Sequence, residues 1–340
     1  MHDSEEGLAT TTVSDPSPLV KFLLCSSSSL PLSKFHLKDR DIEKPEQIMP
    51  MQFTKDTYTL ASRMRVERNG RMLRNATRLC RTPRLEIDVI KRCIPAKYTT
   101  VRELTCGGMS RIYEARSEDQ VVVVKTTDCS RGLGMHEYAC FEFLEEKGLP
   151  IPHIMYIAMY GKILIMILPQ YTFSLSSLLF ALAARHRQTV EDRTLLDATL
   201  HNIRYLLKQF KDQKISYCDF SPDNIMVDVD PKTMAGRLVL IDPQFALPMT
   251  HLTKKIGKHW AQNIDRVHFA YKIRVLAMTD SHMDHIANRI CTEFLGFVPT
   301  EKETKRWILN VLPHGLRVAY DCIDKAQKKS SRKRYGRTER

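Results

Sequence analysis

The chain has 340 residues, a net charge of +13 at pH 7, and 43% hydrophobic and 27% charged residues. This length allows about two domains, and the composition is that of a protein that buries a core. No apolar run approaches the roughly 20 residues of a membrane-spanning helix. The acidic, polar start MHDSEEGLATTT lacks the order of a secretory signal. We therefore expect a soluble, intracellular protein with no membrane partner.

The cysteines, histidines and charges indicate which kinds of site the chain contains. The nine cysteines are dispersed and none forms a C-x-x-C pair, which argues against disulfides or a structural zinc site. His282 and His285 lie three apart, but without a third ligand they indicate packing rather than metal. Residues 63–97 hold eleven Lys or Arg against three Asp or Glu, and residues 325–340 hold eight against one. The positive charge thus belongs to these two flanks.

The N-terminal part of the chain carries little periodic signal. Residues 1–50 are rich in Ser, Pro and Thr, and we expect them to be disordered. Residues 51–98 form a basic extension, read either as a solvated helix packed beside the main domain or as a phosphate-binding arm. Its end, LEIDVIKRCI, alternates enough to be a strand or a short helix.

From residue 99 the pattern changes to that of strands. Two strands flank the Gly-containing turn in LTCGGMSRIYEA, residues 104–115, and a third strand follows at Val121–Lys125. MHEYACFEFLEEKG has helical spacing and predicts a helix that stops at Gly148. KILIMIL, residues 162–168, predicts a buried strand.

The remainder of the chain is largely helical. Residues 175–212 are mostly helix, residues 215–242 alternate short strands with turns, and helical patterns return from about residue 260. Strands first and helices later predict an α+β protein with two lobes. We place the N-lobe at residues 99–168, the C-lobe at 169–324 and a basic tail at 325–340.

Polar residues in a fixed order point to chemistry: Lys125, Glu137, Asp219, Asn224 and Asp242. Backbone amides of a Gly turn approach phosphates closely, and a strand lysine fixed by a helix Glu neutralises phosphate charge. An Asp and an Asn are hard oxygen ligands that suit Mg²⁺, and a further carboxylate can orient or deprotonate a hydroxyl. Alone, the Ser-Pro-Asp-Asn after Phe220 would be an ordinary turn.

Placed together, these motifs resemble the protein-kinase superfamily over roughly residues 100–320. The family's His-Arg-Asp, followed after four residues by Asn, appears as Tyr217-Cys218-Asp219 and Asn224. Its Asp-Phe-Gly appears as Asp242-Pro243-Gln244, and its Val-Ala-Ile-Lys as a run of valines ending in Lys125. The resemblance implies an α+β, two-lobed fold with an antiparallel N-lobe sheet plus one helix and a mostly helical C-lobe.

The same resemblance assigns roles to residues. It implies catalytic residues Asp219 (the base), Lys125 and Glu137, with Asn224 and Asp242 as metal ligands for ATP with Mg²⁺, or Mn²⁺ in its place. Asp265 resembles the buried aspartate of the central C-lobe helix. The implied nucleotide-binding residues are Thr105, Gly107, Gly108, Ser110, Ile112, Lys125, Met166 (near the gatekeeper position) and Leu168.

Several positions depart from the family pattern. Cys218 replaces the Arg that normally receives an activation-loop phosphate, and Gln244 replaces the Gly that lets the metal-binding loop flip. Ser221 stands where Ser/Thr-directed kinases usually carry Lys. Only 22 residues separate Asp242 from Asp265, and no Ala-Pro-Glu motif lies between them. The platform that normally docks a peptide is therefore short or absent.

The sequence leaves three functions open. The first is a serine/threonine protein kinase, which requires a protein substrate. The second is a small-molecule kinase of the same fold, and the third is a pseudokinase scaffold. Residues 63–97 and 325–340 could bind an acidic partner or nucleic acid, and the tail is similar to a nuclear-import signal. The retained catalytic residues amid altered flanks also resemble virus-encoded kinases, including those of herpesviruses.

Overall fold

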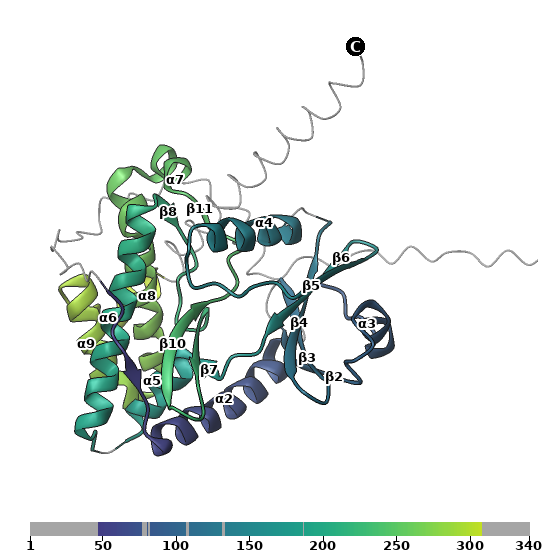
Figure 1. Ribbon diagram of the computed structural model, residues 1–340. Helices are drawn as coiled ribbons and strands as arrows, with labels where there is room; N and C mark the ends of the chain where they lie inside the picture. The colour runs from purple at the N-terminus through teal and green to yellow at the C-terminus, as the bar shows by residue number, and fades with distance from the viewer. Residues whose placement is uncertain are drawn as a thin grey trace, which may run out of the picture.

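The computed structural model describes most of the chain between Gln47 and Trp307 (Figure 1). The predicted N-terminal disorder and the basic tail fall almost wholly outside the described residues, as do Gly107 and Gly108. The structure describes residues 47–76, 80, 82–106, 109–130, 133–185 and 187–307.

The first lobe is built on a five-stranded antiparallel sheet in the order β2-β3-β4-β6-β5. In β6, the isoleucines at 163, 165 and 167 face one hydrophobic cluster, while residues 164, 166 and 168 face another. Both faces are covered, which explains why residues 163–168 are all apolar. The strands are β2 (Thr100–Cys106), β3 (Ser110–Arg116), β4 (Val121–Asp128), β5 (Tyr156–Tyr160) and β6 (Ile163–Pro169).

A helix packs against each face of this sheet. α4 (Leu133–Glu146) contributes Phe141 to one cluster, and α3 (Ile87–Cys93) contributes Ile90 to the other. The sequence predicts that the helix now seen as α4 stops at Gly148. Gly148 has a φ of 68°, a conformation that glycine adopts without strain. LEIDVIKRCI, which precedes the predicted N-lobe, is thus a short helix rather than a strand, and α4 is the predicted helix within residues 99–168.

The second lobe is mainly helical, with a small sheet in the order β1-β10-β9-β7 and a two-stranded pair of β11 and β8. Most of its helices share one large hydrophobic core, whereas α7 packs in a separate, smaller cluster. The helices are α5 (Leu175–Ala183), α6 (Val190–Asp212), α7 (Met249–Ile256), α8 (Lys258–Thr279), η2 (Ser281–Met283), α9 (Asp284–Leu295) and α10 (Glu301–Arg306). The strands are β1 (Met51–Gln52), β7 (Phe173–Ser174), β8 (Ile215–Ser216), β9 (Ile225–Val229), β10 (Ala235–Leu240) and β11 (Leu247–Pro248).

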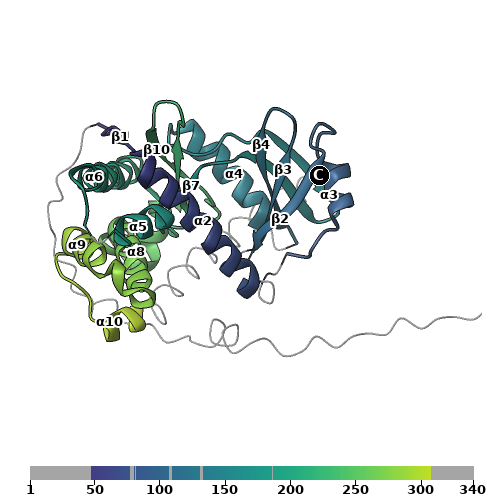
Figure 2. The ribbon, with the colours of Figure 1, turned by 90° about the horizontal axis from the view of Figure 1, so that it is seen from below.

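Residues 51–98, expected as a basic extension, pack into both lobes. β1 pairs antiparallel with β10, and Phe53 is buried against Gly236. α2 (Lys55–Ala76) contacts α5 in the second lobe and β2 in the first. Figure 2 shows it running from the helices of one lobe to the sheet of the other. This segment therefore contributes structure to the domain that follows it.

The elements together form an α+β fold with two lobes, as the sequence predicts. The antiparallel sheet and α4 lie on one side and the helical lobe on the other, joined after β6 (Figure 1). Among the described residues, no helix is both long and apolar enough to cross a membrane.

Candidate active site

Lys125, Glu137 and Asp242 meet between the two lobes. Alternation along β4 turns Lys125 toward α4, where its Nζ forms an ion pair with Glu137 Oε1. The same Nζ lies 2.9 Å from Asp242 Oδ1. Burial would lower the pKa of Lys125, but the carboxylates of Asp242 and Glu137 outweigh burial and raise it. The lysine is therefore charged and held in place.

Asp242 is brought to this lysine by the loop that follows β10. Ile241 N donates to the carbonyl of Asn224 at 2.9 Å, which continues the pairing of β10 with β9. Asp242 itself has a φ of 63°, in the left-handed region that Asp tolerates better than most residues. This turn aims the carboxylate back toward β4.

Asp219 and Asn224 lie on the loop between β8 and β9. Asn224 Nδ2 donates to the backbone oxygen and to Oδ2 of Asp219, both at 3.0 Å. Asp265 on α8 accepts from Ser216 Oγ and Tyr217 N at 3.0 Å, and from Cys218 N at 2.7 Å. A buried carboxylate with three donors holds the start of this loop rigidly.

Tyr217, which the sequence resemblance aligns with a histidine, has a structural role. Its ring is fully buried and stacks on Phe210, with centroids 5.8 Å apart. Its hydroxyl donates to the carbonyl of Ile241, the residue before Asp242. The substitution therefore links the Asp219 loop to the Asp242 loop.

The protonation of Asp219 is set by its surroundings. Burial raises the pKa of the Asp219 carboxyl to about 7, and the positive charge of Lys272 opposes that rise. A general base works best when its pKa is near the operating pH. His268 was not predicted as a site residue. Its Nδ1 donates to the carbonyl of Cys218 at 3.0 Å, and its Nε2 lies 3.4 Å from Asp219 Oδ1. Burial lowers the pKa of His268 to about 3, so the ring is neutral.

A cavity of about 390 Å³ opens beside these groups, within the range of about 300–1,000 Å³ typical of small-molecule sites. Of the residues predicted to bind nucleotide, Thr105, Ser110, Ile112, Lys125 and Leu168 line it. Asp219, Asn224 and Asp242 line it as well. Met166 does not, because it is fully buried in the cluster beneath α4.

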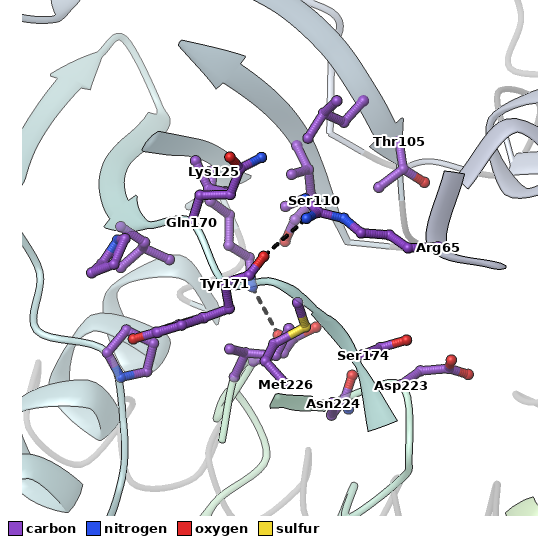
Figure 3. A pocket seen from close by; sticks show the side chains of 18 of the residues that line it. Arg65, Thr105, Ser110, Lys125, Gln170, Tyr171, Ser174, Asp223, Asn224 and Met226 are labelled. Carbon is purple, nitrogen blue, oxygen red and sulfur yellow. Dashed lines mark hydrogen bonds and ion pairs between the residues drawn. The ribbon is translucent and has the colours of Figure 1, made fainter. Parts of the chain in front are cut away.

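Arg65 is a cavity residue that sequence reasoning missed. It projects from α2, and Figure 3 shows it reaching toward Tyr171 at the junction of the lobes. Its Nη1 donates to the carbonyl of Tyr171 at 3.0 Å and to that of Thr172. Burial lowers the pKa of the Arg65 guanidinium. The basic stretch therefore supplies one wall of the cavity, a role its composition alone does not reveal.

Asn224 and Asp242 fit the donor set that a magnesium nucleotide needs. Because Asn224 Nδ2 is committed to Asp219, the amide oxygen is left as a ligand beside the Asp242 carboxylate. Mg²⁺ commonly takes one or two protein oxygens and completes its shell with water and substrate phosphates. Across the described residues, no group of three or more His, Cys, Asp and Glu could hold a metal unaided, and His282 and His285 form no such group.

Comparisons with known proteins add little to this geometry. No family model and no curated protein matches the chain. Among solved structures, the chain is similar to WaaP in complex with acyl carrier protein, at 12% sequence identity and a TM-score of 0.41. The alignment covers 69% of this chain and 91% of that one. A similarity this low says nothing of activity, so function has to be argued from the site.

Proposed function

We propose that the protein is an ATP-dependent phosphotransferase that moves the γ-phosphoryl group of ATP to a hydroxyl. The observation that carries this proposal is the position of Lys125, bridged between Glu137 and Asp242 at the wall of a cavity. The same cavity holds Asp219 and Asn224 on a rigid loop. Phosphoryl transfer requires a positioned cation, two hard oxygen ligands for a metal, and a carboxylate that can accept a proton, here one whose pKa is about 7.

Each of these residues has a distinct part in the proposed reaction. Lys125 would pair with nucleotide phosphates, and Glu137 keeps its ammonium group in position. Asn224 and Asp242 would hold Mg²⁺, which supplies charge neutralisation on the phosphates when bound. Asp219 would orient the accepting hydroxyl and take up its proton, because its raised pKa makes it an effective acceptor near neutral pH.

The acceptor we propose first is a serine or threonine hydroxyl of a protein. A second candidate, a small molecule, is favoured by the segment between Asp242 and α8. That segment is short and folds as β11 and α7, which leaves little chain to dock an extended peptide. Ser221, at the position of the usual Ser/Thr-kinase lysine, is buried and adds no positive charge beside Asp219.

The decisive experiment is transfer of labelled γ-phosphate, measured with Mg²⁺ or Mn²⁺, for the wild type and Asp219→Asn. We expect the variant to lose transfer by at least about 100-fold while its affinity for ATP changes little. Asp212→Asn, an exposed carboxylate at the end of α6, is the matched control and should transfer normally. Undiminished transfer by Asp219→Asn would overturn the assignment of the base.

The acceptor class and the scaffold alternative need separate tests. Labelled polypeptides without labelled metabolites would dismiss the small-molecule candidate, and the reverse result would dismiss the protein candidate. A wild-type protein that shows no thermal shift with ATP and Mg²⁺ would favour a scaffold. Binding of an acidic partner or nucleic acid through residues 63–97 stays a prediction, as does nuclear import through the tail. Deletion of residues 328–340 tests the latter.

A further inference from the structure

Thr82 joins two strands that line the cavity. It follows α2 in the chain, outside the region of kinase resemblance, and is only 1% exposed. Its hydroxyl donates to the carbonyl of Met109 and accepts from the amide of Asp128 at 3.1 Å. Met109 lies just before β3 and Asp128 ends β4, the strand that carries Lys125. One side chain therefore ties the turn before β3 to the lysine strand.

The backbone of Thr82 is itself held by charged groups. Arg111 Nε on β3 donates to the carbonyl of Thr82 at 2.9 Å. The same guanidinium pairs with Glu103 on β2 at 2.9 Å, and the other oxygen of Glu103 lies 3.0 Å from Arg84 Nε. The chain of ion pairs fixes the segment around Thr82 against the outer strands of the sheet.

On its other side, the same turn is linked to the catalytic pair. Thr127 Oγ1 donates to Glu137 Oε2 at 3.3 Å, so the hydroxyl of Ser110, 3.1 Å away, must donate to Thr127. Ser110 and Met109 both line the cavity. The hydrogen bond from Thr82 thus holds Met109, and the bond that Ser110 donates to Thr127 holds Ser110.

We propose that Thr82 is a positioning residue that fixes Met109 and Ser110 in the wall of the nucleotide cavity, an inference that rests on the proposed function. Binding costs less when the groups that contact a ligand are already ordered. Backbone amides near phosphates contribute only if they are held at the correct distance. The segment before the kinase-like region therefore raises affinity for nucleotide without touching it.

The test compares Thr82→Val, which keeps the shape but removes the hydroxyl, with Thr82→Ser, which restores it. For Thr82→Val we expect the Kd for ATP and its KM to rise by about tenfold, with kcat at saturating ATP within about twofold of wild type. Hydrogen exchange of the amides of residues 109–111 should also accelerate. Thr82→Ser should return all three quantities toward wild type. Thr199→Val, a buried threonine on α6 far from the site, is the control for the exchange of Thr for Val.

The results distinguish failure of the role of Thr82 from failure of the proposed function. If Thr82→Val has the same Kd for ATP and the same hydrogen exchange as the wild type, the inference is wrong. An equal change of these two quantities in Thr199→Val would also overturn it. If the wild type binds no nucleotide, the proposed function fails, and hydrogen exchange of residues 109–111 still tests the role of Thr82. If Thr82→Val does not fold, Glu103→Gln takes its place as the test. It removes the charge that holds Arg111, the residue that donates to the carbonyl of Thr82. Unchanged exchange in Glu103→Gln would then overturn the inference.

Discussion

Substitution of Lys125 by Met removes the cation that joins Glu137 to Asp242. The Glu137 side chain is fully buried, and its remaining hydrogen bond comes from Thr127 Oγ1 at 3.3 Å. A buried carboxylate left without its partner costs about 3–5 kcal/mol. We expect Lys125→Met to lower the free energy of unfolding by about this amount at pH 8 and to abolish phosphoryl transfer.

The double variant Lys125→Met with Glu137→Gln shows how much of the lost free energy of unfolding comes from the unpaired Glu137 charge and how much from lost packing of the lysine. Removing both charges leaves no uncompensated ion that is fully buried, because the Asp242 side chain is 29% exposed, so the double variant should be more stable than Lys125→Met alone. We expect it to recover about half of the loss or more. Urea unfolding of the wild type, the two single variants and the double variant at pH 8 measures this coupling.

The pH dependence gives a second check on the same reasoning. Burial raises the pKa of Glu137, and without Lys125 nothing of comparable strength opposes that rise. Between the unfolded and folded pKa values, the folded variant holds a proton that the unfolded chain releases, so its stability falls as pH rises. The penalty of Lys125→Met should therefore be larger at pH 8 than at pH 5. A penalty that is equal at both values and is not relieved by Glu137→Gln would refute the argument.

Three further outcomes are expected. Burial alone would raise the pKa of Glu114, but hydrogen bonds led by those from Arg102 lower it to about 2. Glu114→Gln should therefore lose about 1 kcal/mol of stability at pH 7, a small value because the arginines are more than half exposed; urea titrations should show the loss disappear as pH falls from about 4.5 toward 2. Gly236→Ala places a Cβ 2.4 Å from Phe53 Cε2 and should cost about 1–3 kcal/mol in denaturant unfolding. Asp265→Asn turns one carboxylate oxygen into a donor that faces other donors, so kcat should fall about tenfold or more while KM for ATP changes less.

Much of the site could be predicted because its residues belong to regular elements. Side chains alternate along the strand that carries Lys125 and recur every 3.6 residues along the helix that carries Glu137, so each side chain has a defined direction. Asp219 and Asn224 are close in sequence and share one loop, which makes their contact local. Asp242 follows a strand that pairs with the strand after that loop. Order along the chain was therefore enough to bring these residues together.

Other parts of the site depend on packing between distant segments. Arg65 belongs to a stretch whose charge density predicts solvent exposure, yet its helix packs on both lobes and partly buries it. Met166 was expected in the nucleotide cavity, but the alternation of β6 directs it beneath α4. His268 sits among apolar residues of α8, where a histidine is usually part of the core. Its contact with Asp219 arises only when α8 crosses the loop.

The span of the kinase resemblance and the span of the functional unit differ. The resemblance begins near residue 100, but two residues before it contact residues that line the cavity. Arg65 fixes the carbonyls of residues 171–172 where the lobes join, and Thr82 fixes Met109 at the turn before β3. β1 in turn completes the sheet that contains β9 and β10, the strands that place Asn224 and Asp242. A chain cut at residue 99 would keep the five proposed site residues but lose Arg65, Thr82 and β1, so we expect the smallest unit with an intact site to start at β1.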